Sequence, residues 1–190
     1  METKENEVSV DNLHRCPVSK LTKRERELLV ESWEHIQLHD KELRTTTNVS
    51  LLLWLLENIP NMRARLEVKV PKTLPFPELL ANEMFIIHSK ALFDSLDRFV
   101  SLSDDPVKLE QKMRSIAKMH VNLVPSVGME YFRKLETNFD DFIAGSLKTT
   151  IADERVQIWG QFLGAFCHFI EEEEKKHNPN SEKTHCCVIL

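Results

Sequence analysis

The sequence contains little glycine and tyrosine, and it lacks long apolar runs. Four glycines and one tyrosine occur in 190 residues, which disfavours a β-sandwich or a β-barrel with many tight turns. No uninterrupted apolar stretch approaches the roughly 18 residues that a membrane-spanning helix requires. Apolar residues recur instead at helical spacing over long segments. The sequence therefore predicts an all-α fold.

Cysteine is also sparse, and its four positions show no disulfide pattern. Cys186 and Cys187 are adjacent, Cys167 lies among phenylalanines in a helical stripe, and Cys16 lies in a polar segment. We therefore expect a reducing, cytosolic compartment. The first residues form no apolar leader, and position 2 is glutamate rather than the glycine that N-myristoylation requires.

Several function classes are disfavoured by what the sequence does not contain. The formal net charge of −5 argues against a nucleic-acid partner, because such proteins carry a basic patch. We find no glycine-rich phosphate-binding loop and no arrangement of serine, histidine and aspartate typical of nucleophilic catalysis. What remains is a chain of ordinary globular composition, 42% hydrophobic and 29% charged, long enough for one domain with a sizeable core.

The apolar periodicity predicts seven to eight helices in one domain, residues 21–176. A polar tail (1–20) precedes this domain, and a flexible C-terminal tail (177–190) follows it. The longer helices are expected after the capping box Thr22–Glu25, after Asn48, over 82–101, after Asp105-Pro106, over 126–144 and over 151–176. Pro60 can open a short helix, and the prolines within 67–77 predict a stiff, extended connection.

Two histidines lie on apolar helical faces and are the candidates for chemistry. His88 follows Phe85 and His120 follows Ile116, each at helical spacing. Burial of an imidazole is unfavourable unless the ring finds a partner. A haem iron is such a partner, because it takes neutral imidazole as an axial ligand and the porphyrin favours apolar walls. A histidine in this setting is more often a satisfied core residue, so the residues alone leave both interpretations open.

Several short motifs in one register resemble those of the globin family. The separation of 32 residues between His88 and His120 is similar to that of vertebrate nerve globins. The resemblance covers about residues 21–175. Its motifs are Thr22-Lys23-Arg24-Glu25 with Ser32-Trp33, Leu55-Leu56 with Pro60, His88-Ser89-Lys90-Ala91-Leu92, Ile116-Ala117-Lys118-Met119-His120, and Trp159.

The resemblance implies a globin-like fold around haem b and assigns roles to residues of the pocket. His120 would be the proximal iron ligand. His88 would be the distal residue, which either hydrogen-bonds bound O₂ or coordinates the iron as a sixth ligand. Leu92 and Leu52 would lie over the distal side of the ring, and Ile116 would pack beneath it on the proximal side.

One position departs from the family pattern. Six residues after Pro60 globins nearly always have a phenylalanine stacked on the haem, and here that position is Leu66. Either Leu66 replaces the ring with aliphatic packing, or Phe76 fills the space from the proline-rich connection. This departure supports a competing hypothesis, a haem-free helical interaction module with structural histidines.

The last four residues, Cys187-Val188-Ile189-Leu190, match the Cys-aliphatic-aliphatic-X prenylation signal. A final leucine favours a geranylgeranyl group, and Cys186 is a candidate for palmitoylation. Chance could also produce such an ending. With the signal, we expect a protein held at the cytosolic face of a membrane, for instance the plasma membrane.

The expected function is reversible binding of O₂ or another diatomic gas. Membrane attachment suits bulk oxygen storage poorly, and favours gas sensing, NO or nitrite chemistry, or electron transfer with a membrane reductase or signalling partner. Whether the chain is an enzyme is left open. The resemblance of the histidine spacing to that of nerve globins implies a six-coordinate ferrous iron, with His88 as the sixth ligand.

Overall fold

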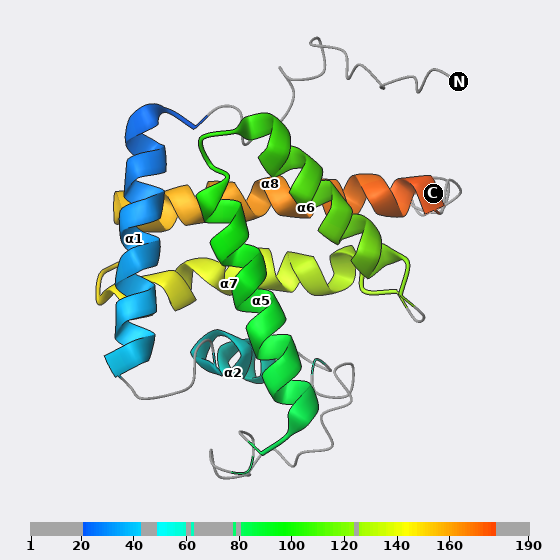
Figure 1. Cartoon of the computed structure of the whole chain (residues 1–190), viewed down its shortest axis with the longest axis horizontal. Helices are drawn as coiled ribbons and strands as arrows, with labels where there is room; N and C mark the ends of the chain where they lie inside the picture. Colours follow the sequence, from blue (N-terminus) through cyan, green and yellow to red (C-terminus); the bar gives the residue numbers. More distant parts are fainter. Residues whose placement is uncertain are drawn as a thin grey trace, which may run out of the picture.

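Six helices make up the described part of the chain in the computed structural model, which describes residues 21–42, 49–59, 62, 78, 81–123 and 126–177 (Figure 1). They are α1 (Lys23–Glu42), α2 (Val49–Asn58), α5 (Glu83–Ser101), α6 (Pro106–Val121), α7 (Met129–Leu147) and α8 (Glu154–His177). No strand occurs among these residues, which confirms the all-α prediction. Leu66, Phe76, Cys186, Cys187 and the predicted helix opened by Pro60 lie outside the described residues.

Helix starts follow the capping signals of the sequence. At α1 the predicted capping box is present: Thr22 N donates to Glu25 Oε2 at 2.6 Å, and Glu25 N donates to Thr22 Oγ1 at 3.2 Å. These bonds satisfy backbone donors that the first helical turn leaves without a partner. At α6 the Asp105 carboxylate accepts from Lys108 N at 3.1 Å, and Pro106 occupies the first turn, where its missing N–H costs nothing.

The boundaries predicted for the last two helices are wrong by about one turn. Helix α7 begins at Met129 rather than 126, because Gly128 caps it in an extended conformation, and it continues to Leu147 rather than 144. Helix α8 begins at Glu154 rather than 151, because the Asp153 carboxylate accepts from Arg155 N at 2.9 Å. The guanidinium of Arg155 also holds the pKa of Asp153 well below its usual range. Caps of this kind determine the first residue of a helix. The regular spacing of apolar residues can extend beyond a cap, and it then predicts too long a helix.

Gly128 leaves room for the Glu174 carboxylate of α8 where α7 starts, and a side chain at this position would overlap that carboxylate. That carboxylate lies beside a helix N-terminus, where a negative charge is typically worth about 0.3–1 kcal/mol. Gly128→Ala would displace it, and we expect the free energy of unfolding to fall by about 1 kcal/mol in urea titrations. Gly145→Ala is the matched control: nothing lies within 4 Å of the added methyl, so it should stabilise the helix by about 0.5–1 kcal/mol. Equal gains in both variants would contradict this role of Gly128.

Helices α7 and α8 run antiparallel behind α1, α5 and α6, and α2 packs against α5 and α7 (Figure 1). Trp159 of α8 is fully buried at the centre of this packing. Its indole Nε1 donates to Ser32 Oγ at 2.8 Å, and that of Trp33 donates to Asp97 Oδ1 at 2.9 Å. A buried indole N–H needs such a partner, so these bonds fix α1 against α8 and α5. No helix of the described residues is long and apolar enough to cross a membrane.

Apolar spacing predicts that Phe85, His88, Leu92, Ser95, Leu96 and Phe99 of α5 face the core, and of these the structure buries only Phe85, Leu96 and Phe99. Ser89 and Val100 are buried, whereas His88 and Ser95 are only partly buried. Among the residues that the structure describes, none is a hydrogen-bond partner of the Ser89 hydroxyl. Apolar periodicity does not predict the burial of Ser89, because serine is polar and does not count among the apolar residues that define the buried face of a helix.

Replacing Ser89 with alanine should therefore stabilise the protein. A buried hydroxyl without a partner costs about 1–3 kcal/mol, and alanine also has the higher helix propensity. We expect thermal or urea unfolding to show a gain of about 1 kcal/mol. Ser95→Ala is the control, because the Ser95 hydroxyl donates to Ala91 O at 2.7 Å. A loss of stability in Ser89→Ala would mean that the hydroxyl has a partner.

Candidate functional site

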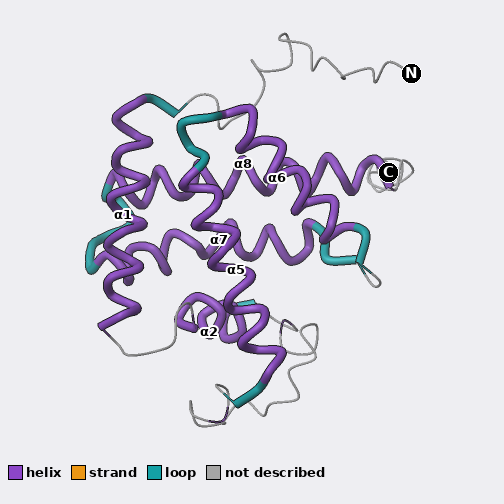
Figure 2. The backbone as a smooth tube through the Cα atoms, viewed as in Figure 1, coloured by secondary structure: helices purple, strands orange, loops and turns teal. Residues whose placement is uncertain are grey.

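The two candidate histidines lie on helices that diverge from a common corner. Helices α5 and α6 meet at Leu102–Asp105 and make few other contacts with each other (Figure 2). His88 lies 14 residues before Leu102 and His120 lies 15 residues after Asp105. At 1.5 Å per residue these arms measure about 21 and 22 Å of helix. The two histidines therefore lie at similar distances along α5 and α6 from the turn that joins these helices.

His120 presents one ring nitrogen as a ligand. Its ring is partly buried, and Nδ1 lies 2.9 Å from Ile116 O. A carbonyl can only accept, so Nδ1 carries the proton and Nε2 of the neutral ring keeps its lone pair. Burial is the largest effect on His120 and lowers its pKa, the hydrogen bond to Ile116 O opposes this, and the nearby His88 adds a smaller lowering effect. The neutral, metal-binding form is therefore favoured, and the two rings lie within electrostatic range of each other.

His88 has the same arrangement on α5. Its ring is partly buried, and Nδ1 donates to Met84 O at 2.8 Å. Nε2 of the neutral ring again carries the lone pair, with no hydrogen-bond partner among the described residues. Both histidines thus offer Nε2 to a ligand and hold Nδ1 on the backbone of their own helix, as histidine ligands of metals usually do.

Helix α6, which carries His120, is fixed to α8 through Arg114. The guanidinium donates to Glu110 at 2.7 Å and to Glu172 at 2.5 Å, and it lies over the Phe169 ring at 4.3 Å from the ring centre. These carboxylates raise the pKa of Arg114, although burial of the side chain opposes them as the largest single effect. A paired, stacked guanidinium is a rigid anchor, so the position of α6 is set by α8.

The other predicted site residues fall on the same two faces or beside them. Leu92 lies one turn after His88, and Ile116 one turn before His120; both are partly buried and pack against the core. Leu52 is fully buried on α2, the helix that packs against α5. These three residues thus lie on α5, α6 and α2, and their contacts with a haem stay predictions. The sequence gives no sign of a contact between Phe132 and His120, yet the centres of their rings lie 5.3 Å apart.

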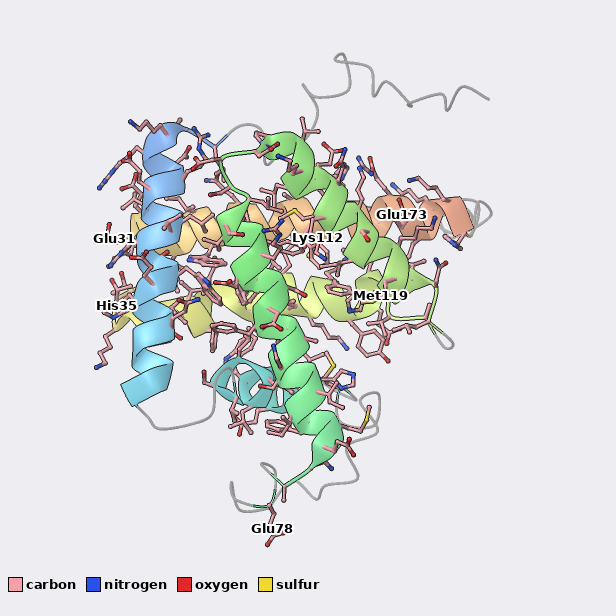
Figure 3. All side chains as sticks on the ribbon, in the orientation of Figure 1. Glu31, His35, Glu78, Lys112, Met119 and Glu173 are labelled. Atoms are coloured by element: carbon pink, nitrogen blue, oxygen red, sulfur yellow. The ribbon has the colours of Figure 1, made fainter. Side chains whose placement is uncertain are left out.

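Exposed apolar side chains gather near the histidines. Met84 and Ile87 on α5 are 37% and 51% exposed, and Met119 on α6 (Figure 3) and Leu123 just after it are 54% and 47% exposed. Each lies within four residues of His88 or His120. Large exposed apolar side chains such as these, on each of the two helices, are typical of surfaces that a ligand or partner covers.

The donor set suits haem better than a bare metal ion. Within the described residues no group of three or more histidine, cysteine, aspartate or glutamate side chains could hold a metal. A haem iron takes four ligands from the porphyrin, so one or two imidazoles complete it. The two Nε2 lone pairs and the apolar side chains around them therefore fit the cofactor.

Comparisons with known proteins agree with this geometry. The globin family model matches residues 76–170, a segment that contains both histidines. A globin of Biomphalaria glabrata is 27% identical over 146 residues, which are 77% of this chain and 94% of that protein. In fold, the chain is similar to the solved globin-like protein Glb-12 from C. elegans, with a TM-score of 0.57 and 18% identity over 85% of this chain and 96% of that one. The chain belongs to the globin family.

Proposed function

We propose that the chain binds haem b between His120 and His88. The observation that carries this proposal is the pair of partly buried imidazoles on α5 and α6, each with Nδ1 held by a backbone carbonyl and Nε2 available. His120 would be the proximal ligand, and its bond to Ile116 O would orient the ring and raise its basicity. When bound, haem supplies an iron that takes up O₂ or another diatomic gas. Ile116 would line the proximal side of the ring, Leu52 and Leu92 the distal side, and Leu66 would replace the usual stacked phenylalanine with aliphatic packing.

The tautomer of His88 favours iron coordination over a hydrogen bond to bound gas. A distal histidine stabilises bound O₂ by donating from Nε2. In this chain Nδ1 donates to Met84 O, so the neutral ring has no proton on Nε2 to donate. That nitrogen can instead act as a ligand. We therefore propose a six-coordinate resting state in which an external gas competes with His88, an arrangement that suits ligand-gated signalling or electron transfer better than gas storage.

Titration of the purified apoprotein with hemin tests the proposal. We expect a Soret band that saturates at one hemin per chain, with the sharp, split visible bands of a six-coordinate ferrous iron after reduction. His35→Ala, which alters an exposed histidine of α1 (Figure 3), is the control and should bind hemin as the wild type does. A titration without saturation, or with equal hemin uptake by an unrelated helical protein, would exclude a specific haem site.

A lipid anchor is a further part of the proposal, and it rests on the motif at Cys187 alone. Where Leu190 is the C-terminal residue, we propose that Cys187 is geranylgeranylated and that Cys186 is acylated. Each buried methylene contributes about 0.8 kcal/mol, but durable anchoring usually takes two lipid chains. The anchored protein would lie at the cytosolic face of a membrane, beside a membrane reductase or signalling partner.

Cell fractionation of N-terminally tagged protein checks this anchor. Wild type should sediment with membranes, Cys186→Ser should be partly released, and Cys187→Ser should be fully released. The buried Cys167 serves as the control, because Cys167→Ser should leave the distribution unchanged. An unmodified C-terminal peptide that still ends in Val188-Ile189-Leu190, found by mass spectrometry, would contradict prenylation.

A further inference from the structure

The plane of the His120 ring is incompletely fixed by its own helix. The only hydrogen bond of this imidazole in the described structure runs from Nδ1 to Ile116 O, at 2.9 Å. The torsion that turns the ring of a histidine about its Cβ–Cγ bond has a broad, shallow energy well. A single bond to the preceding turn therefore leaves a range of ring orientations, and a second contact is needed to select one.

Phe132 supplies a second contact from α7. Its ring centre lies 5.3 Å from that of His120, and the two planes stand at 88°. This is an edge-to-face pair within the preferred range of about 4.5–7 Å between ring centres. Rotation of either ring would break the perpendicular arrangement, so the contact resists the motion that the hydrogen bond permits.

Phe132 is itself firmly held. Its ring stands perpendicular to that of Phe166, with centres 5.4 Å apart, and Phe166 in turn packs against Phe99 of α5 at 5.5 Å. The backbone carbonyl of Phe132 accepts from the buried Cys167 thiol at 3.7 Å. Burial raises the pKa of that thiol to about 12, so it stays protonated and keeps donating.

We propose that Phe132 is a positioning residue that sets the ring plane of His120, and with it the angle between the His120 and His88 imidazoles. The effect on the angle between two iron ligands rests on the proposed haem function, whereas the contact between Phe132 and His120 is present without haem. With two imidazole ligands on one iron, the angle between their planes determines the rhombic splitting of the ferric low-spin spectrum. A positioned ring gives one spectrum, and an unrestrained ring gives several.

Nuclear magnetic resonance of the apoprotein tests the contact directly. In the wild type we expect nuclear Overhauser effects between the Phe132 and His120 ring protons. In Phe132→Leu the His120 ring signals should shift and broaden, because the ring current and the restraint are both removed. Phe132→Tyr should keep the wild-type pattern. Phe162→Leu is the matched control, since the ring contacts of Phe162 are with Phe99 and Trp159.

Electron paramagnetic resonance of the ferric, haem-loaded protein tests the consequence. The wild type, Phe132→Tyr and Phe162→Leu should each give one sharp set of low-spin signals, whereas Phe132→Leu should give a broadened or multiple set. Absence of the Overhauser effects in the wild type, or His120 signals that respond equally to Phe132→Leu and Phe162→Leu, would overturn the proposal. If the apoprotein results are as expected but the wild type takes up no haem, positioning by Phe132 stands and the proposed function fails.

Discussion

Haem should be lost, or held only weakly, when His120 is replaced by alanine. This change removes Nε2, the nitrogen that the Ile116 carbonyl orients through Nδ1. Loss of an outer-shell partner of a metal ligand already costs about 10–100-fold in affinity, so loss of the ligand itself should cost at least about 100-fold. Hemin titration followed by transfer to a scavenger apoprotein measures the change.

Two further measurements distinguish the loss of an iron ligand in His120→Ala from a loss of fold stability. His120 is partly buried, and circular dichroism of the apoprotein should show an unchanged helix content in His120→Ala. Exogenous imidazole should restore part of the Soret band, because it can enter the space that the side chain leaves and coordinate the iron. A variant with wild-type affinity and an unchanged spectrum would show that His120 is not the proximal ligand.

The second large effect is expected from His88→Leu. Leucine keeps the apolar volume and removes the lone pair that Nε2 presents while Nδ1 donates to Met84 O. The ferrous spectrum should change from six-coordinate to five-coordinate. Carbon monoxide should also bind faster, because no internal ligand has to leave first. Absorption spectra and flash photolysis measure the two effects.

His88→Gln refines the same experiment. Glutamine can donate a hydrogen bond to bound gas but is a poor iron ligand, so it should give a five-coordinate ferrous form with slower O₂ release than His88→Leu. A five-coordinate ferrous spectrum in the wild type would contradict the coordination of the iron by His88. In that case the bond from Nδ1 to Met84 O would have to break and the proton would have to move to Nε2, from which it could be donated to the gas.

Local signals in the sequence accounted for most of the helical framework. The capping box at Thr22 and Glu25 and the Asp105-Pro106 start of α6 are present as predicted. These features depend on residues three or four apart, so a reading of the sequence can find them. The starts of α7 and α8 were predicted about three residues too early, because the apolar periodicity of each segment extends past its capping residue, Gly128 or Asp153.

Side-chain environments were predicted less well than helices. Ser89 was not among the residues of α5 expected to face the core, yet it is buried, because the rotation of a helix about its axis is set by the elements that pack against it. The contact between His120 and Phe132 could not be inferred either. His120 and Phe132 lie on two different helices, and the helical spacing of apolar residues within one helix does not predict contacts with another.

The sequence by itself determined the helical class, the helix caps, and the two histidines at a spacing and in motifs that resemble those of globins. Their hydrogen bonds to Met84 O and Ile116 O also follow from local helix geometry, because a residue and the carbonyl four positions before it lie on one face. Tertiary structure alone decided that α8 fixes α6 through Arg114 and that Phe132 stands against His120. Those contacts join residues from separate helices, and only the packing of the whole core sets the angles and distances between helices.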